Sequence, residues 1–179
     1  MKAFITGGTG QVGTELIRRA DSWNFDIVAP TRSELNLLDD TEVYSQLDQI
    51  RPDIVVNSAA FTAVDAAETE SDAAFQVNRD AVRIVADSCT QLSIPIIHLS
   101  TDYVFDGTKA ATYEESDLIC PIGVYGKSKA AGEAAVREIS GKHVILRTSW
   151  VYAAHGNNFV KTMLRIGEER QILNVVNDQ

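Results

Sequence analysis

A glycine-rich turn near the N-terminus constrains the fold of this chain more than any other feature. A short apolar segment with strand character, residues 1–5, leads directly into Gly7, Gly10 and Gly13, which are spaced G-x-x-G-x-x-G ahead of an amphipathic helical segment. Glycines at this spacing allow a tight turn, a close approach of the backbone to a pyrophosphate, and close packing of helix on strand. The pattern predicts a βα unit whose helix N-terminus binds the phosphates of a dinucleotide. An ordinary glycine-rich βα turn is the alternative reading.

Strand and helix patterns alternate along the rest of the chain. Further strands are expected at 25–30, 54–57, 94–99, 144–147 and 172–176, and further helices at 41–50, 72–92, 123–139 and 159–169. The alternation predicts one α/β domain over residues 1–179, a doubly wound parallel sheet of the Rossmann type with helices on both faces. Ligands bind such sheets beyond the C-terminal strand ends, where the sequence places 7–13, 31–32, 58–61, 100–103 and 148–150.

Composition limits the partners and the compartment. A chain of 179 residues that is 45% hydrophobic can bury one core, and a net charge of −9 argues against nucleic acid or an anionic membrane as partner. We find no apolar stretch of membrane-spanning length, and the first residues read as a strand rather than a signal peptide. Cys89 and Cys120 are expected to be structural and suit a reducing cytoplasm. The scattered histidines predict no histidine metal site, whereas Mg²⁺ and a homodimer are left open.

A second pattern carries chemistry. Tyr125 and Lys129 lie four residues apart and would share one face of a helix, and Thr101 lies about one structural unit upstream. An ammonium beside the phenol would lower its pKa from about 10 and make it a proton donor at cellular pH. A Tyr-x-x-x-Lys spacing alone arises often by chance; its combination with the glycine turn is specific.

These segments together resemble a known enzyme family. The chain is similar to the extended short-chain dehydrogenases/reductases, and within them to the dTDP-4-dehydrorhamnose reductases. The resemblance covers essentially the whole chain. It is carried by Thr6–Gly13, Arg51–Asp65, Ser100–Gly107 (STDYVFDG), Tyr125–Glu133 and Arg147–Tyr152 (RTSWVY), of which STDYVFDG and RTSWVY are the most selective.

The resemblance implies a reaction and a set of site residues. The C4 ketone of a dTDP-linked 4-keto-6-deoxyhexose would be reduced to dTDP-L-rhamnose with NADPH or NADH, for cell-surface polysaccharide synthesis. Thr101, Tyr125 and Lys129 would be catalytic, and Thr101, Asp102, Tyr103 and Trp150 would contact the sugar nucleotide. The cofactor would contact Gly7, Gly10, Gln11, Val12, Gly13, Arg32, Asn36, Leu37, Ala60, Phe61, Thr62, Leu99, Tyr125 and Lys129. Family members continue into a smaller C-terminal substrate domain, so we expect this chain to lack most of that domain.

Two departures bear on the cofactor. No acidic residue follows the second strand until Glu34, so nothing is placed to grip the ribose 2′-hydroxyl of NADH, whereas Arg32 could pair with a 2′-phosphate. We therefore favour NADPH and keep NADH; a solvated surface arginine is the alternative for Arg32. Asn36 stands where related chains usually have Asp near the adenine, and its carbonyl can still accept an amino proton.

Other roles fit several of the same residues. Trp150 could lie in the core or at the rim of the fold. Thr101 could only cap a turn, and Asp102 could only hydrogen-bond within its loop. Phe105 and Tyr152 are assigned to packing. A non-catalytic nucleotide-binding regulatory subunit is the alternative function from another class, disfavoured because Tyr125 and Lys129 are both present. A sugar-nucleotide epimerase or dehydratase is the alternative enzyme, although the expected Glu does not follow Asp102.

Overall fold

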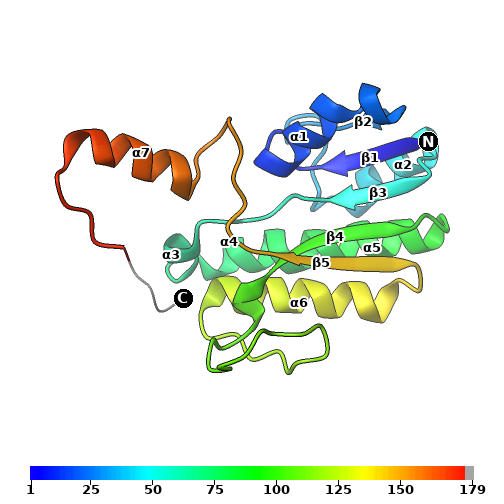
Figure 1. Ribbon diagram of the computed structural model, residues 1–179. Coiled ribbons are helices and arrows are strands. Elements are labelled where there is room, and N and C mark those ends of the chain that lie inside the picture. Colours follow the sequence, from blue (N-terminus) through cyan, green and yellow to red (C-terminus); the bar gives the residue numbers. More distant parts are fainter. Residues whose placement is uncertain (176–179) are drawn as a thin grey trace.

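A five-stranded parallel sheet forms the centre of the molecule. The structure, a computed structural model, describes residues 1–175, and its strands lie in the order β2-β1-β3-β4-β5 with every neighbouring pair parallel (Figure 1). The strands are β1 (Lys2–Thr6), β2 (Asp26–Val28), β3 (Ile54–Asn57), β4 (Ile96–Thr101) and β5 (His143–Thr148). The order reverses at β1, which confirms the predicted doubly wound parallel sheet.

Helices cover the two faces unequally. The helices are α1 (Gln11–Arg19), α2 (Asp40–Ile50), α3 (Val64–Ala67), α4 (Ser71–Phe75), α5 (Ala81–Gln91), α6 (Val124–Ile139) and α7 (Phe159–Glu169), with short turns at Asp21–Trp23 (η1), Gln76–Asp80 (η2) and Asp102–Val104 (η3). Helix α5 packs between α2 and α6 on one face, and the core lies between these helices and the strand residues Phe4, Val55 and Ile96. No helix within residues 1–175 is both long and apolar enough to cross a membrane.

Helix α2 shows how local sequence sets an element. Asp39 begins it as the N-cap, because its carboxylate accepts the Glu42 backbone N–H at 3.0 Å. Arg51 ends it in the left-handed conformation. Val43 and Leu47 lie on one face and are buried in the core.

The long helix expected at 72–92 is interrupted. It forms as α4 and α5 joined by the π-helical turn η2, and α3 precedes it without having been predicted. The turn carries Asn78, whose side chain is fully buried and bonds outside the helix. An inserted residue of this kind widens one turn while leaving the apolar periodicity on both sides unchanged, so the pattern predicts one continuous helix.

The strand expected at 172–176 is wrong over its described residues. Residues 172–175 have no strand structure, and Val176 lies outside the described part of the chain. A strand needs a neighbour for its backbone groups, but residues 170–175 do not run along the edge strand β5 (Figure 1). No residue of α7 is buried, so the helix does not hold the following segment against the sheet.

Candidate dinucleotide and substrate site

One large cavity lies along the C-terminal edge of the sheet. Its volume is about 910 Å³, and segments that follow all five strands line it. The arrowheads of β1 and β3 in Figure 1 point to this edge. Every residue expected to contact cofactor or substrate lines the cavity: Gly7, Gly10, Gln11, Val12, Gly13, Arg32, Asn36, Leu37, Ala60, Phe61, Thr62, Leu99, Thr101, Asp102, Tyr103, Tyr125, Lys129 and Trp150.

The glycine turn forms a backbone cradle at the start of α1. Gly7 adopts φ +73°, and the Gly10 N–H donates to its carbonyl at 3.0 Å. A Cβ on Gly13 would lie only 2.4 Å from the same carbonyl oxygen, so α1 packs as closely on the turn as the spacing predicts. No side chain caps α1, whose first N–H groups therefore face the cavity edge without a side-chain acceptor. This arrangement fits a dinucleotide pyrophosphate.

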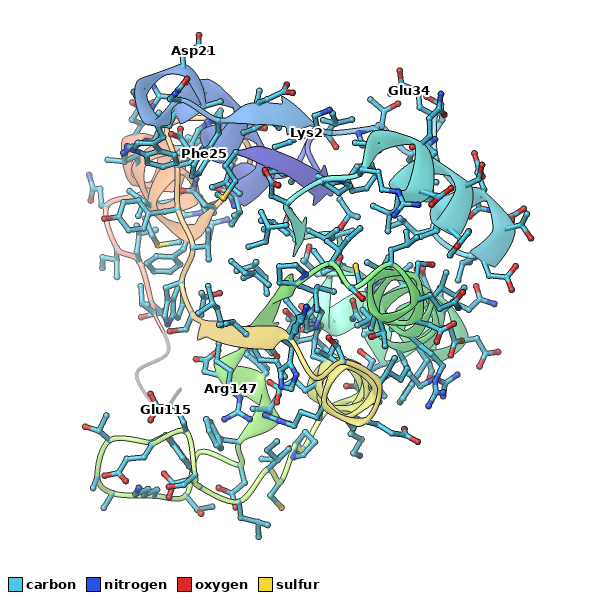
Figure 2. The ribbon with its side chains drawn as sticks, turned by 90° about the vertical axis from the view of Figure 1, so that its right-hand side faces the viewer. Lys2, Asp21, Phe25, Glu34, Glu115 and Arg147 are labelled. Carbon is cyan, nitrogen blue, oxygen red and sulfur yellow. The ribbon has the colours of Figure 1, made fainter. Side chains whose placement is uncertain are left out.

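The segment after β2 holds one cation and one carboxylate with different partners. Arg32 is exposed, lines the cavity and forms no ion pair with any described residue. The Glu34 carboxylate instead accepts both the backbone N–H and the hydroxyl of Thr31, each at 2.8 Å, and these bonds hold its pKa below the usual value. Glu34 sits on the loop before α2 (Figure 2). The side-chain Oδ1 of Asn36 accepts the Leu38 N–H at 3.1 Å, so one of its lone pairs is already used.

Tyr125 and Lys129 lie on α6 as predicted, but the ammonium binds elsewhere than expected. Lys129 is 2% exposed, and its Nζ donates to the Leu99 carbonyl oxygen at 2.6 Å. Burial lowers its pKa to about 8, which the nearby Glu133 carboxylate only partly opposes. The predicted lowering of the Tyr125 pKa is wrong for this structure: burial raises it, and the Thr101 hydroxyl offsets that only in part.

Thr101 occupies the end of β4 in two roles. Its Oγ1 accepts the Tyr103 N–H at 3.2 Å, which caps η3, and donates to Asp102 Oδ1 at 3.0 Å. The turn brings the Tyr103 ring edge-to-face with Tyr125 at a centroid distance of 5.5 Å. The capping alternative for Thr101 is therefore correct, and the same turn places Thr101 beside Tyr125 in the cavity wall.

A buried asparagine that sequence reasoning missed fixes the cavity wall. Asn78 accepts the Phe61 N–H at 2.9 Å and donates to the Phe61 carbonyl at 3.1 Å. It also donates to the Ser128 hydroxyl at 2.9 Å, next to Lys129 on α6. It thereby ties the loop after β3 to α6, the helix that carries Tyr125 and Lys129. An asparagine in the middle of a helical pattern, where it is a poor helix former, was the available signal.

A buried ion pair holds the end of β5 to α6. The Glu133 carboxylate is fully buried and accepts two bonds from Arg147, at 2.9 and 2.7 Å, and one from Arg137 at 3.0 Å. Burial would raise the Glu133 pKa, but these bonds outweigh it and the pKa is lowered. The Arg147 guanidinium also lies 5.0 Å from the centroid of the Phe105 ring, beside the loop that carries Glu115 (Figure 2).

Some of the roles predicted for the aromatic residues and cysteines are confirmed and one is wrong. Phe105 stacks on Tyr113 at 4.2 Å, which confirms its packing role, whereas Tyr152 is 72% exposed and its assignment to packing is wrong. Trp150 is a cavity-rim residue in contact with Phe159. Cys89 is buried, and burial raises its pKa to about 12, as expected of a structural cysteine; the Cys120 side chain is exposed. Among the described residues, no group of three or more His, Cys, Asp or Glu side chains could hold a metal ion.

The fold and the cavity define a class of protein. A glycine turn at the first βα junction, a cavity along the strand ends and a Thr–Tyr–Lys set on β4 and α6 are the features of a dinucleotide-binding domain of the short-chain dehydrogenase/reductase type. The chain belongs to the family described as the RmlD substrate binding domain, whose model matches residues 1–179.

Named relatives and solved structures agree with this family. The chain is 45% identical to the dTDP-4-dehydrorhamnose reductase of Aggregatibacter actinomycetemcomitans, over 99% of this chain and 61% of that protein. A dTDP-4-dehydrorhamnose reductase structure from Clostridium acetobutylicum superimposes with a TM-score of 0.96 at 36% identity, over 100% of this chain and 64% of that one. The corresponding Bacillus anthracis protein, solved in complex with NADP, gives 0.91 at 40% identity, over 95% and 61%. The chain thus spans about three fifths of the length of the curated relatives it matches.

Proposed function

We propose that this chain is the nucleotide-binding and proton-donating part of an NADPH-dependent reductase that converts the C4 ketone of dTDP-4-dehydrorhamnose to the alcohol of dTDP-L-rhamnose. One observation carries the proposal. Thr101, Tyr125 and Lys129 line the same cavity as an uncapped α1 N-terminus. A proton donor and a dinucleotide cradle on one cavity are what a carbonyl reduction requires.

Three side chains would handle the proton. Burial keeps the Tyr125 phenol neutral at cellular pH, so it holds the proton that a reduced carbonyl oxygen needs. The Thr101 hydroxyl, at the end of β4, would hydrogen-bond the same oxygen as charge builds on it. Lys129 is a buried ammonium with one protein acceptor, which leaves N–H donors to orient a ribose hydroxyl. The hydride is the chemistry that a nicotinamide cofactor supplies when bound.

The segment after β2 favours NADPH over NADH. Arg32 has no ion-pair partner among the described residues, so its guanidinium is available for a 2′-phosphate. Glu34, the nearest acid, is turned onto Thr31 and does not present a free carboxylate for a ribose 2′-hydroxyl. The Bacillus anthracis relative was solved with NADP.

The cavity also has a wall for the substrate. Asp102, Tyr103 and Trp150 form the wall on which the sugar nucleotide would rest, and residues 1–179 act as one nucleotide-binding domain. A cytoplasmic location fits synthesis of a soluble sugar nucleotide. We keep the homodimer that the sequence leaves open as part of the proposal. Mg²⁺ is not part of it, because no group of three or more His, Cys, Asp or Glu side chains among the described residues could hold a metal ion.

Calorimetric titration of the chain with NADPH and with NADH tests the proposal. Arg32→Ala should weaken NADPH binding by about tenfold or more, the loss expected for one charge-assisted phosphate contact, and leave NADH nearly unchanged. Arg83→Ala, which removes an exposed arginine on α5 outside the cavity, is the matched control. Equal losses for the two cofactors would remove Arg32 from phosphate recognition. A folded chain that binds neither cofactor would refute the proposed function.

A further inference from the structure

The segment between β5 and α7 is tied to the rest of the domain through polar contacts with α1. We call residues 149–158 the strap; it leaves the end of β5 and runs past the C-terminal edge of the sheet to α7 (Figure 1). Within residues 1–175, every hydrogen bond from the strap or α7 to the rest of the domain ends on Gln11. His155 Nδ1 adds a contact to Glu15 Oε1 at 3.4 Å.

Two side chains of the strap hydrogen-bond to Gln11, one to its side chain and one to its backbone. Asn158 Nδ2 donates to Gln11 Oε1 at 3.0 Å, and His155 Nε2 donates to the Gln11 carbonyl at 3.3 Å. Asn158 is also the N-cap of α7, since its Oδ1 accepts the Lys161 N–H at 3.1 Å. A single side chain therefore joins α7, the strap and the first residue of α1.

Gly156 packs closely against the side chain of Gln11. It adopts φ +71°, and a Cβ at this position would lie 3.0 Å from Gln11 Cγ. The Lys161 ammonium then holds the strap in this shape by donating to the Ala154 and Gly156 carbonyls, at 3.2 and 2.9 Å. The strap thus has a defined shape that is docked on Gln11.

The other end of the strap carries Trp150 in a strained conformation. Trp150 has φ +52°, a left-handed conformation that costs a residue with a side chain about 1–2 kcal/mol. Such strain persists only where the surroundings hold it. The indole is 56% exposed, lines the cavity and contacts Phe159, the first residue of α7, edge-to-face at 4.8 Å. Both Trp150 and its partner therefore depend on how α7 is anchored.

We propose that Gln11 is a positioning residue that couples occupation of the dinucleotide cradle to the placement of Trp150 in the substrate wall. The inference rests on the proposed function. Gln11 is the first residue of α1, where a bound pyrophosphate would order the free N–H groups. Ordering Gln11 orders the strap and α7 through Asn158, and this fixes the indole. The cofactor thereby prepares the surface on which the sugar nucleotide rests.

The two tryptophans of the chain, Trp23 and Trp150, make the coupling measurable. In a Trp23→Phe background, Trp150 is the sole indole. The protein is titrated with NADP⁺, which does not absorb indole emission, by fluorescence and by calorimetry in parallel. Saturable heat shows that NADP⁺ binds, as the proposed function requires. A change in Trp150 emission with the same midpoint shows that this binding alters the strap. Acrylamide quenching of the ligand-free protein measures how firmly Trp150 is held.

Asn158→Ser is the decisive variant, because serine still caps α7 but has no amide to reach Gln11. We expect its dissociation constant for NADP⁺ to stay within about twofold of the parent, the emission change to lose most of its amplitude, and acrylamide quenching to rise. Gly156→Ala should act in the same way by lifting the strap from Gln11. Asn174→Ser, the same change at an exposed residue, should behave like the parent.

The outcomes separate the two proposals. A full emission change in Asn158→Ser and in Gly156→Ala would overturn the coupling while leaving cofactor binding intact. Heat without any emission change in the parent would do the same. Absence of binding heat would overturn the proposed function, and with it the coupling between the dinucleotide cradle and Trp150.

Discussion

Removing the Tyr125 hydroxyl should separate chemistry from cofactor binding. Tyr125→Phe keeps the ring that packs on Tyr103 and deletes the hydroxyl that we propose as the proton donor. In the reductase that we propose this chain to be part of, we expect kcat for reduction of dTDP-4-dehydrorhamnose to fall by about 10²–10⁴-fold. The affinity for NADPH should change by less than about threefold. Tyr113→Phe, on the loop after Phe105, is the control. Turnover that survives Tyr125→Phe would exclude the phenol as the donor.

Lys129 should destabilise the cofactor-free protein at neutral pH. Its pKa falls from 10.5 to about 8 on folding, because burial disfavours the charged form. The unfolded chain therefore binds more protons than the folded one between pH 8 and 10.5, and stability rises with pH across that window. Lys129→Met should raise the free energy of unfolding by about 2 kcal/mol at pH 7 and by less above pH 9. Urea denaturation at both pH values measures this; a pH-independent difference would contradict it.

The residues of the cavity could be predicted from the sequence more fully than their ionisation. Strand-end positions such as Thr101 and Trp150 follow from the alternation of elements, and each lines the cavity. The i, i+4 spacing of Tyr125 and Lys129 fixes a shared helix face. It does not show that the ammonium binds the Leu99 carbonyl, because that acceptor comes from a strand thirty positions earlier in the sequence. The Tyr125 pKa was predicted wrongly because burial of the phenol raises it, and the spacing of the two residues does not show that burial.

At the scale of elements, Asn78 joins the turn η2 to α6 and to the loop after β3. Asn78→Ala would leave the partly buried N–H and C=O of Phe61 and the buried Ser128 hydroxyl without this partner. We expect the free energy of unfolding to drop by about 2–4 kcal/mol. Gln76→Ala, an exposed change in the same π-helical turn, should cost less than about 1 kcal/mol. Equal losses in urea denaturation would show that the Asn78 contacts carry no special weight.

Element boundaries follow the sequence where a local signal exists. Asp39 caps α2 and the 3.6-residue period of α6 is regular, so both helices form within a residue or two of their expected bounds. The π-helical turn has no such signal beyond Asn78 itself. The expected strand at 172–176 has a composition typical of strands. A strand must also pair with a neighbouring strand, and composition does not predict whether the segment lies beside an edge of the sheet.

At the scale of the whole molecule, the two faces of β5 are covered unequally. Ile145 and Arg147 point to α6, and Arg147 pairs with the buried Glu133 there. Val144 and Leu146 alternate with them on the opposite face, where they are 50% and 45% exposed. No residue of α7 is buried, so that helix does not cover them. An edge strand with apolar side chains on an open face favours association with another chain.

Replacing both exposed residues should therefore reduce self-association without unfolding the domain. Threonine suits a strand and is polar, so Val144→Thr/Leu146→Thr should lower the concentration-dependent mass measured by sedimentation equilibrium. The free energy of unfolding should change by less than about 1 kcal/mol, as for other surface substitutions. Ile145→Thr, the matched change on the α6 face of the same strand, should instead cost about 1–3 kcal/mol because it places a hydroxyl against the core. Unchanged self-association of the double variant would place any dimer contact elsewhere, while equal stabilities of the double variant and Ile145→Thr would contradict the unequal cover of the sheet.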